Sequence, residues 1–261
     1  MAKNQEFRMP KVSSADRPFV MRLVAYILGP LVHLLFHVEV KGKEKLPKDG
    51  AYILVFNHVT HLDPLVVAYA TFFGLKRGPH FLAKGGLFTV PVLGPLLIAA
   101  GQVPVYRNGR RNVEPMEAAY KFLEAGHVIT IFPEGTLTRE PNGWPMRGKT
   151  GSVRMAIESG VPIYAAGQWG SEIVLPTYTK KLRPKPWHKV RVQIGDEIDL
   201  SKYRGRQLTT EELKDATKQV MKAITKEVEF LRDAKAPKDL YDPADHGQSQ
   251  FGNFNKNGKN K

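Results

Sequence analysis

The apolar positions of this chain fall into short runs separated by glycine, proline and charged residues. Unbroken runs without polar alternation are typical of strands buried on both faces of a parallel sheet. Three such runs occupy 51–56, 127–132 and 161–166. Weaker or shorter patterns predict further strands at 38–40, 80–83, 103–106 and, with alternating exposure, 189–194.

Amphipathic segments lie between these runs and predict helices. They cover 65–73, 113–125, 148–159 and 209–231, the last beginning at Thr210 with Glu211 and Glu212 in its first turn. Strands that alternate with helices predict a single α/β domain over residues 38–233, with a mostly parallel central sheet flanked by helices. The irregular apolar segment 90–100 fits either a wall that faces acyl chains or an ordinary buried segment.

The first 37 residues form a separate pattern that predicts a membrane-associating helical segment. Residues 17–40 are mostly apolar but are interrupted by Gly29-Pro30, whereas a spanning helix needs about 20 apolar residues. We predict two short helices joined at Gly29-Pro30 that lie in the membrane interface, with a core helix pair or a true span as alternatives. At the other end, the polar composition of residues 234–261 predicts a disordered tail.

Composition and charge restrict the function. The 261-residue chain has no cysteine, which excludes disulfides, a thiol nucleophile and cysteine-ligated zinc. Its net charge of +14 favours polyanionic partners. Because no nucleic-acid-binding motif accompanies the charge and basic residues flank the N-terminal apolar segment, we expect an anionic phospholipid membrane rather than nucleic acid as the partner.

Candidate chemistry begins where the run 51–56 ends. His58 follows the strand directly, and Asp63-Pro64 reads as the N-cap and first residue of a helix. The turn between them can fold the carboxylate onto the imidazole, and an imidazole held by a carboxylate is a general base. A simple capping role for Asp63, or a metal site that uses His58 and His61, are the alternatives; no third metal ligand lies nearby in sequence.

Other polar groups stand at the ends of neighbouring predicted strands. Arg107 can pair with phosphate oxygens, and Lys84 is a weaker phosphate partner. In the turn after 127–132, Glu134 can accept hydrogens from substrate hydroxyls, Gly135 permits close backbone approach and Thr136 can donate. Taken alone, Arg107 is better explained as a solvated loop residue and the 132–136 segment as a capping turn.

A serine nucleophile is not indicated, because no G-x-S-x-G elbow follows a strand. His58, as a base, must therefore activate a hydroxyl that the substrate brings. This predicts transfer of an acyl group to an alcohol without a covalent enzyme intermediate, and without a metal or other cofactor.

Four sequence blocks resemble those of the glycerolipid acyltransferase family, specifically the PlsC-type 1-acylglycerol-3-phosphate acyltransferases. Residues 57–63 look like its NHxxxxD signature, and the other three blocks follow in the family's order at 101–107, 132–136 and 161–163. Pro104 departs from the pattern, because family members often carry a bulky apolar residue there. The resemblance covers roughly residues 35–200.

The resemblance implies specific roles. His58 would be the catalytic base and Asp63 its orienting partner, while Arg107, Glu134 and Gly135 would hold the glycerol phosphate of the acceptor. We also expect Asn57, Thr136 and Lys84 at the substrate site.

The family's acceptor is lysophosphatidic acid, and the acyl donor would be acyl-CoA or acyl-carrier protein. The expected location is the cytoplasmic face of the cell membrane, as a peripheral or monotopic protein. Acylation of another acceptor is the alternative within the family. A non-catalytic lipid-binding protein and a basic nucleic-acid-binding protein are the alternatives outside it.

Overall fold

A seven-stranded sheet lies between two layers of helices in the computed structural model, which describes residues 10–105, 113–179 and 181–249. The strands are β1 (Phe36–Lys41), β2 (Tyr52–Phe56), β3 (His80–Lys84), β4 (Val103–Val105), β5 (Val128–Ile131), β6 (Ile163–Trp169) and β7 (His188–Glu197). Their order is β1-β7-β6-β2-β5-β3-β4. Only the β6–β7 pair is antiparallel, so the predicted mostly parallel sheet is confirmed.

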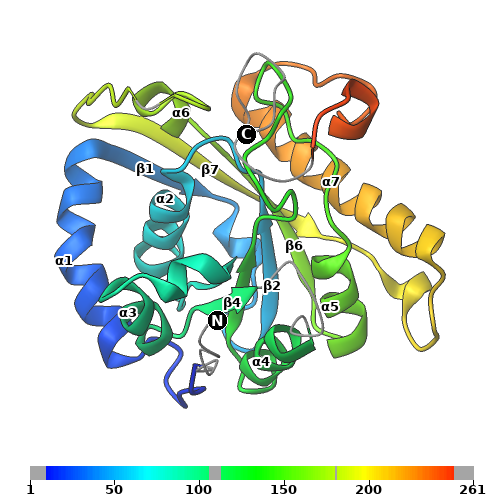
Figure 1. The fold of residues 1–261 in the computed structure, drawn as a ribbon, viewed down its shortest axis with the longest axis horizontal. Helices are drawn as coiled ribbons and strands as arrows, with labels where there is room; N and C mark the ends of the chain where they lie inside the picture. Colours follow the sequence, from blue (N-terminus) through cyan, green and yellow to red (C-terminus); the bar gives the residue numbers. More distant parts are fainter. Residues whose placement is uncertain (1–9, 106–112, 180, 250–261) are drawn as a thin grey trace, which may run out of the picture.

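Helices cover both faces of this sheet (Figure 1). The α-helices are α1 (Phe19–Leu35), α2 (Asp63–Tyr69), α3 (Leu93–Ala99), α4 (Val113–Glu124), α5 (Gly151–Ser159), α6 (Ser171–Val174) and α7 (Thr210–Arg232). On one face, α4, α5 and α7 pack against the side chains of Ile53 and Val55. On the other face, Leu54 and Phe56 pack against α2 and the end of α1. Alternate residues of β2 therefore supply two separate cores.

Short helical turns complete the path of the chain. They are η1 (Lys43–Lys45), η2 (Ala70–Gly74), η3 (Gly85–Thr89), η5 (Ser201–Tyr203) and η6 (Pro243–His246), of which η2 is a π-helix that continues α2. The long helix α7 begins with a capping box, in which Thr209 and Glu212 satisfy each other's backbone N–H groups. Pro104 lies in the edge strand β4, where a missing ladder donor is tolerated.

The predicted N-terminal helix pair is wrong, because residues 19–35 form one continuous helix with Pro30 inside it. Packing explains why the proline does not end this helix. Met21, Gly29 and Val32 are buried, and a Cβ on Gly29 would come within 2.8 Å of the Phe73 ring. Contact along this face offsets the roughly 3 kcal/mol that an interior proline costs. The helix runs directly into β1, so it is part of the domain.

The predicted tail is also partly ordered. Tyr241 pairs with Met146, its carbonyl accepts from the Arg147 N–H at 2.9 Å, and η6 follows. Leu240 packs against the core. Residues 250–261 of the predicted tail lie outside the described part of the chain. The prediction of disorder is therefore wrong for residues 234–249, which pack against the domain despite their polar composition.

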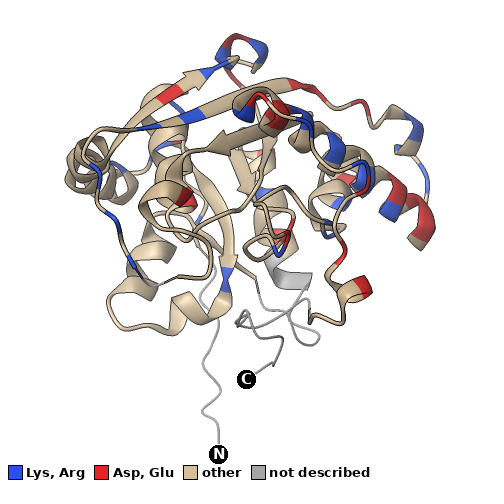
Figure 2. Cartoon of the chain, turned by 90° about the horizontal axis from the view of Figure 1, so that it is seen from above, with Lys and Arg blue, Asp and Glu red and all other residues tan. Residues whose placement is uncertain are grey.

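Charge is distributed unevenly over this fold. Figure 2 shows Lys, Arg, Asp and Glu concentrated on the side of the sheet that α7 covers, while the side that carries α1 is mostly uncharged. The exposed apolar residues of α1 are Phe19, Leu23, Tyr26, Ile27, Leu28, Leu31 and Leu34. Among the described residues, no helix combines the length and apolarity required to cross a bilayer.

Candidate active site

The topology brings the predicted site residues to one edge of the sheet. Strands β2, β3, β4, β5 and β6 run parallel, so the residues that follow them meet at their carboxyl ends. His58 follows β2, the 132–136 turn follows β5, and Lys84 ends β3. Arg107 follows β4 but lies outside the described residues, together with Arg110 and Arg111.

His58 is held by Asp63 as predicted. Its ring Nδ1 lies 3.0 Å from Asp63 Oδ2, which also accepts the N–H groups of Val59 at 2.6 Å and Thr60 at 2.9 Å. None of these contacts involves the Nε2 atom of His58, and His58 lines a cavity of about 1540 Å³. The predicted capping role of Asp63 is wrong, because this fully buried carboxylate turns back to the His58 loop rather than to its own helix.

The backbone and ring face of His58 are also fixed. Its N–H donates to Glu134 Oε1 at 2.8 Å, and its carbonyl accepts from the Thr138 N–H at 2.7 Å. The ring stacks on Phe132, with 4.4 Å between centroids. Contacts with residues that follow β5 therefore fix the position of the His58 imidazole within the protein itself.

Glu134 has a different contact from the one we predicted. Both of its oxygens accept backbone N–H groups, from His58 and from Met146 at 3.1 Å, and the residue is 2% exposed. Burial raises the pKa of Glu134 to about 8, and the two backbone donors oppose that shift. Glu134 borders the cavity of His58, but because both of its oxygens already accept backbone N–H groups, the predicted contact with substrate hydroxyls does not fit.

Asn57 is likewise not available to a substrate. It is fully buried, its Nδ2 donates to the Gln168 carbonyl at 3.0 Å, and its Oδ1 accepts the Gln168 N–H at 2.8 Å. This pair of bonds extends the β2–β6 ladder by one side chain. Asn57 therefore fixes the point at which the chain leaves the sheet and His58 begins.

The other predicted residues do line the cavity. Gly135 has φ +68°, and the side chain of Lys149 would lie 3.1 Å from a Cβ placed on it. A larger residue at position 135 would therefore displace Lys149. Thr136 and the exposed Lys84 also line the cavity, as do Arg147 and Lys149, which we did not predict.

Ser171 is a further residue that sequence reasoning missed. Its hydroxyl donates to Asp63 Oδ1 at 2.7 Å and lies 3.1 Å from Gln168 Oε1. Ser171 and Gln168 are both fully buried. The sequence could have indicated Ser171, since Gly170-Ser171 follows β6 as His58 follows β2. The polar Gln168 near the end of β6 made the end of that strand difficult to predict.

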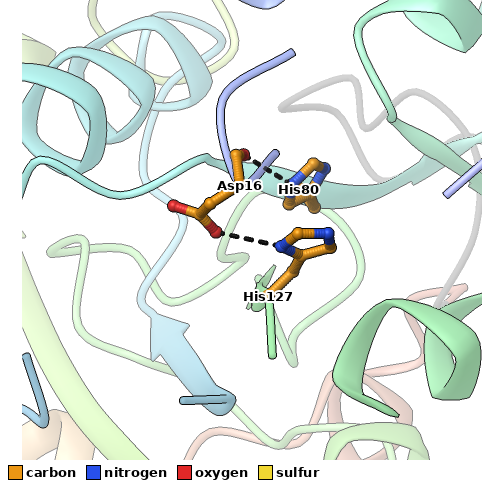
Figure 3. A group of neighbouring side chains, drawn as sticks. All are labelled: Asp16, His80 and His127. Atoms are coloured by element: carbon orange, nitrogen blue, oxygen red, sulfur yellow. Dashed lines mark hydrogen bonds and ion pairs between the residues drawn. The ribbon is translucent and has the colours of Figure 1, made fainter. Parts of the chain in front are cut away.

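One group of possible metal ligands lies elsewhere. Among the described residues, Asp16, His80 and His127 have ligand-type atoms within 4.8 Å of one another (Figure 3). They lie at the amino ends of β3 and β5, away from His58. Both ring nitrogens of His127 face acceptors, Asp16 Oδ1 at 3.3 Å and the Ser13 carbonyl at 2.6 Å. We interpret Asp16, His80 and His127 as a structural hydrogen-bond network rather than a metal site. His61 is exposed and does not join His58 in such a group.

Known proteins resemble this chain in both sequence and fold. Residues 37–168 match the sequence profile of the family described as Acyltransferase. A 1-acyl-sn-glycerol-3-phosphate acyltransferase of Borreliella burgdorferi is 36% identical over 128 residues, 48% of each chain. A chloroplastic 1-acyl-sn-glycerol-3-phosphate acyltransferase of Brassica napus is 28% identical over 61% of this chain and 44% of its own length. The chain thus spans about half the length of these curated relatives.

A solved structure is similar over more of the chain. The crystal structure of the 1-acyl-sn-glycerophosphate acyltransferase PlsC from Thermotoga maritima has a TM-score of 0.59 and 25% identity. The match covers 83% of this chain and 82% of that one. A match of this extent supports the α/β fold that positions His58 and the turn after β5.

Proposed function

Because this chain belongs to the acyltransferase family, we propose that it transfers a fatty acyl group from a thioester to the free hydroxyl of lysophosphatidic acid, which gives phosphatidic acid. The observation that carries the proposal is the His58–Asp63 pair, whose histidine lines a large cavity. The names of the relatives support the choice of acceptor. The thioester donor is acyl-CoA or acyl-carrier protein.

The proposed reaction is a direct transfer. His58 Nε2 takes the proton of the acceptor hydroxyl while its oxygen attacks the thioester carbonyl carbon. The tetrahedral intermediate collapses, the C–S bond breaks, and the imidazolium returns its proton to the thiolate. Asp63 stabilises the imidazolium in between, and general-base assistance of this kind contributes ~10²–10⁴-fold. The reaction requires no cofactor, since proton and acyl group both end on the products.

Some groups near His58 are unsuited to stabilise the oxyanion. The N–H groups of His58, Val59 and Thr60 already donate to carboxylates, and that of Gly135 donates to the Phe132 carbonyl. A donor for the oxyanion must therefore come from another group that lines the cavity, and we propose the side chain of Thr136. The cationic side chains of Lys84 and Arg147 lie in the same cavity and suit the acceptor phosphate, beside the proposed role of Arg107.

Access from a membrane surface completes the proposal. The exposed apolar stripe of α1 is accompanied by exposed apolar residues of η3, of α3 and of the segment between them, which are Leu87, Val90, Val92, Leu93 and Leu96. Helices α1 and α3 contact each other, and Leu87 and Leu97 also line the cavity of His58. A lipid acceptor could thus pass from the bilayer into the cavity along apolar side chains. Since thioester donors are made in the cytoplasm, we propose docking on the cytoplasmic face.

An acceptor panel tests the function. Purified protein receives one labelled acyl-CoA with lysophosphatidic acid, glycerol-3-phosphate or lysophosphatidylcholine, and products are read by mass spectrometry beside release of free thiol. We expect labelled phosphatidic acid in stoichiometric amount with thiol, and none from the His58→Ala variant. Thiol release without labelled lipid would contradict acyl transfer, and a preferred product from another acceptor would contradict the choice of lysophosphatidic acid.

Membrane docking has its own test. Deletion of the N-terminal helix is unsuitable, because Val32 of that helix belongs to the core. Leu23→Ser with Ile27→Ser changes exposed side chains only, at 48% and 64% exposure. We expect this variant to lose flotation with vesicles while it keeps its melting temperature, whereas unchanged flotation would move the docking surface elsewhere.

A further inference from the structure

A second cavity, of about 470 Å³, lies at the opposite edge of the sheet from His58. It is formed by segments that precede strands: Gly50 before β2, Arg77 before β3, and Gly126 with His127 before β5. Residues 14–17 and Arg22 of α1 close its other side. This cavity is therefore independent of the groups that surround the proposed catalytic base.

The lining of this cavity is strongly basic. Arg17, Arg22, Lys48, Lys76 and Arg77 supply five cations, against the two carboxylates of Asp16 and Asp49. A concave site lined by one sign of charge concentrates ions of the opposite sign. The composition of the lining thus favours an anion of more than one negative charge.

Asp16 does not compensate the cations at the cavity rim, because it is fully engaged with the structure below it. Its carboxylate accepts from Arg77 Nε at 3.1 Å, from the Gly78 N–H at 2.7 Å and from His127 (Figure 3). Hydrogen bonds from His127, Gly78 and Arg77 outweigh burial and hold the pKa of Asp16 at about 2. Within the described lining, the four cations of Arg17, Arg22, Lys48 and Lys76 are then opposed only by Asp49.

Arg77 lines this cavity from a fixed position. Its side chain is 10% exposed; Nη2 donates to the carbonyls of Gly50 and Gly126, and Nε donates to Asp16. Its Nη1 is buried and has no hydrogen-bond partner among the residues that the structure describes. Beside it, Lys76 is exposed at φ +58°, a left-handed conformation that side-chain-bearing residues adopt infrequently. These bonds fix the guanidinium in the cavity wall, and the exposed Lys76 beside it lines the same cavity.

The position of the cavity indicates where that ligand comes from. Arg17 precedes α1, and Arg22 lies three residues after Phe19, at the edge of the exposed apolar stripe of that helix. A lipid whose tails contact the stripe would therefore present its headgroup to the cavity. A phosphate at this place would face cations from several segments of the chain.

We propose that this cavity binds the phosphate headgroup of an anionic phospholipid and so orients the protein on the bilayer. The proposal rests on the proposed docking of α1, but not on the acyl transfer chemistry. Bound in this way, the protein would have a preference for phosphate-rich lipid beyond the general attraction of its positive charge.

The test compares two variants with equal loss of charge. The cavity variant carries Arg22→Gln, Lys48→Gln and Lys76→Gln, all exposed residues. The control variant carries Lys222→Gln, Lys226→Gln and Lys238→Gln, also exposed and outside both cavities. Flotation is measured with phosphatidylcholine vesicles that contain 20 mol% phosphatidic acid, and with phosphatidylcholine alone, beside thermal melting of all three proteins.

We expect the cavity variant to bind phosphatidic acid vesicles about 100-fold more weakly than wild type, since each of the three basic residues contributes about fivefold at an anionic surface. The control should lose several-fold less, and both should melt as wild type does. Equal losses in the two variants would overturn the proposal, as would wild-type protein that binds both vesicle types alike.

Two further arms distinguish a lipid headgroup from free phosphate, and docking from catalysis. Inorganic phosphate at millimolar concentration should weaken vesicle binding by wild type more than by the cavity variant. Phosphate that binds the cavity, detected by calorimetry, without any effect on vesicle binding would overturn the lipid assignment. Acyl transfer in uncharged detergent micelles should be the same in all three proteins. Lack of acyl transfer by wild type in micelles would contradict the catalytic proposal, whereas the flotation results test only the headgroup site.

Discussion

Asp63→Asn separates the charge of the carboxylate from its geometry. An asparagine oxygen can keep the contacts that Asp63 Oδ2 makes with Val59, Thr60 and His58, at 2.6, 2.9 and 3.0 Å. Its amide group then faces the Ser171 hydroxyl, which can accept it and donate instead to Gln168 Oε1, already 3.1 Å away. The substitution should therefore fold and leave the His58 loop in place.

The expected loss is catalytic. A full charge pair at 3.0 Å interacts by roughly 5 kcal/mol at an effective dielectric constant of about 20. The proton is only partly transferred in the transition state, so we expect kcat to fall by about 10²–10⁴-fold. The KM values for acceptor and donor should change little, because Asp63 is fully buried and does not line the cavity.

Steady-state acyl transfer with both substrates varied, read by thiol release, measures this effect. Thermal melting accompanies it, and Asp63→Ala serves as the contrast, because it strips two backbone N–H groups of their acceptor and should destabilise the fold. A folded Asp63→Asn protein that keeps more than half of its kcat would refute the reasoning.

Three further predictions test the surroundings of the pair. Ser171→Ala removes the hydroxyl that donates to Asp63 Oδ1 and should lower kcat about 5–50-fold with KM unchanged. Thr71→Val is the control, because it removes a buried hydroxyl without a described partner and should leave kcat unchanged. Similar kinetics in the two variants would count against a positioning role for Ser171. Wild type should lose stability as pH rises from about 4.5 to about 8, because the pKa of Glu134 is raised and deprotonation leaves a charged carboxylate buried. Glu134→Gln should flatten the melting-temperature profile over this pH range. An identical slope in the variant would contradict the raised pKa of Glu134. Hydrogen bonding to Asp16 raises the pKa of His127, so the stabilisation by protonated His127 is present below about pH 6.5 and is lost above the pKa of the folded state. The difference in melting temperature between wild type and His127→Asn should therefore narrow between pH 6 and pH 9. A difference that widens would contradict the raised pKa of His127.

Much of the fold could be predicted because its strands are buried on both faces. The run Tyr52–Phe56 is fully apolar and is the central strand, so the residues after it had to lie at a carboxyl edge. The same logic located the turn after β5. The pairing of His58 with Asp63 followed, since the intervening turn is too short to separate them.

The errors arose where tertiary contacts decide the structure. Pro30 is a helix breaker in isolation, but the neighbouring Gly29 packs against Phe73, and the helix continues past the proline. Glu134 has the chemistry of a substrate-binding carboxylate, and only the fold shows that backbone N–H groups occupy it. Ser171 reaches Asp63 from 108 residues away, a separation that local sequence patterns do not connect.

General-base catalysis by His58 is tested most directly by the kcat of His58→Ala in acyl transfer to lysophosphatidic acid, measured on protein whose melting temperature matches wild type. We expect a loss of about 10²–10⁴-fold, the share that general-base assistance supplies. A folded variant that transfers acyl groups at close to the wild-type rate would show that another group removes the proton.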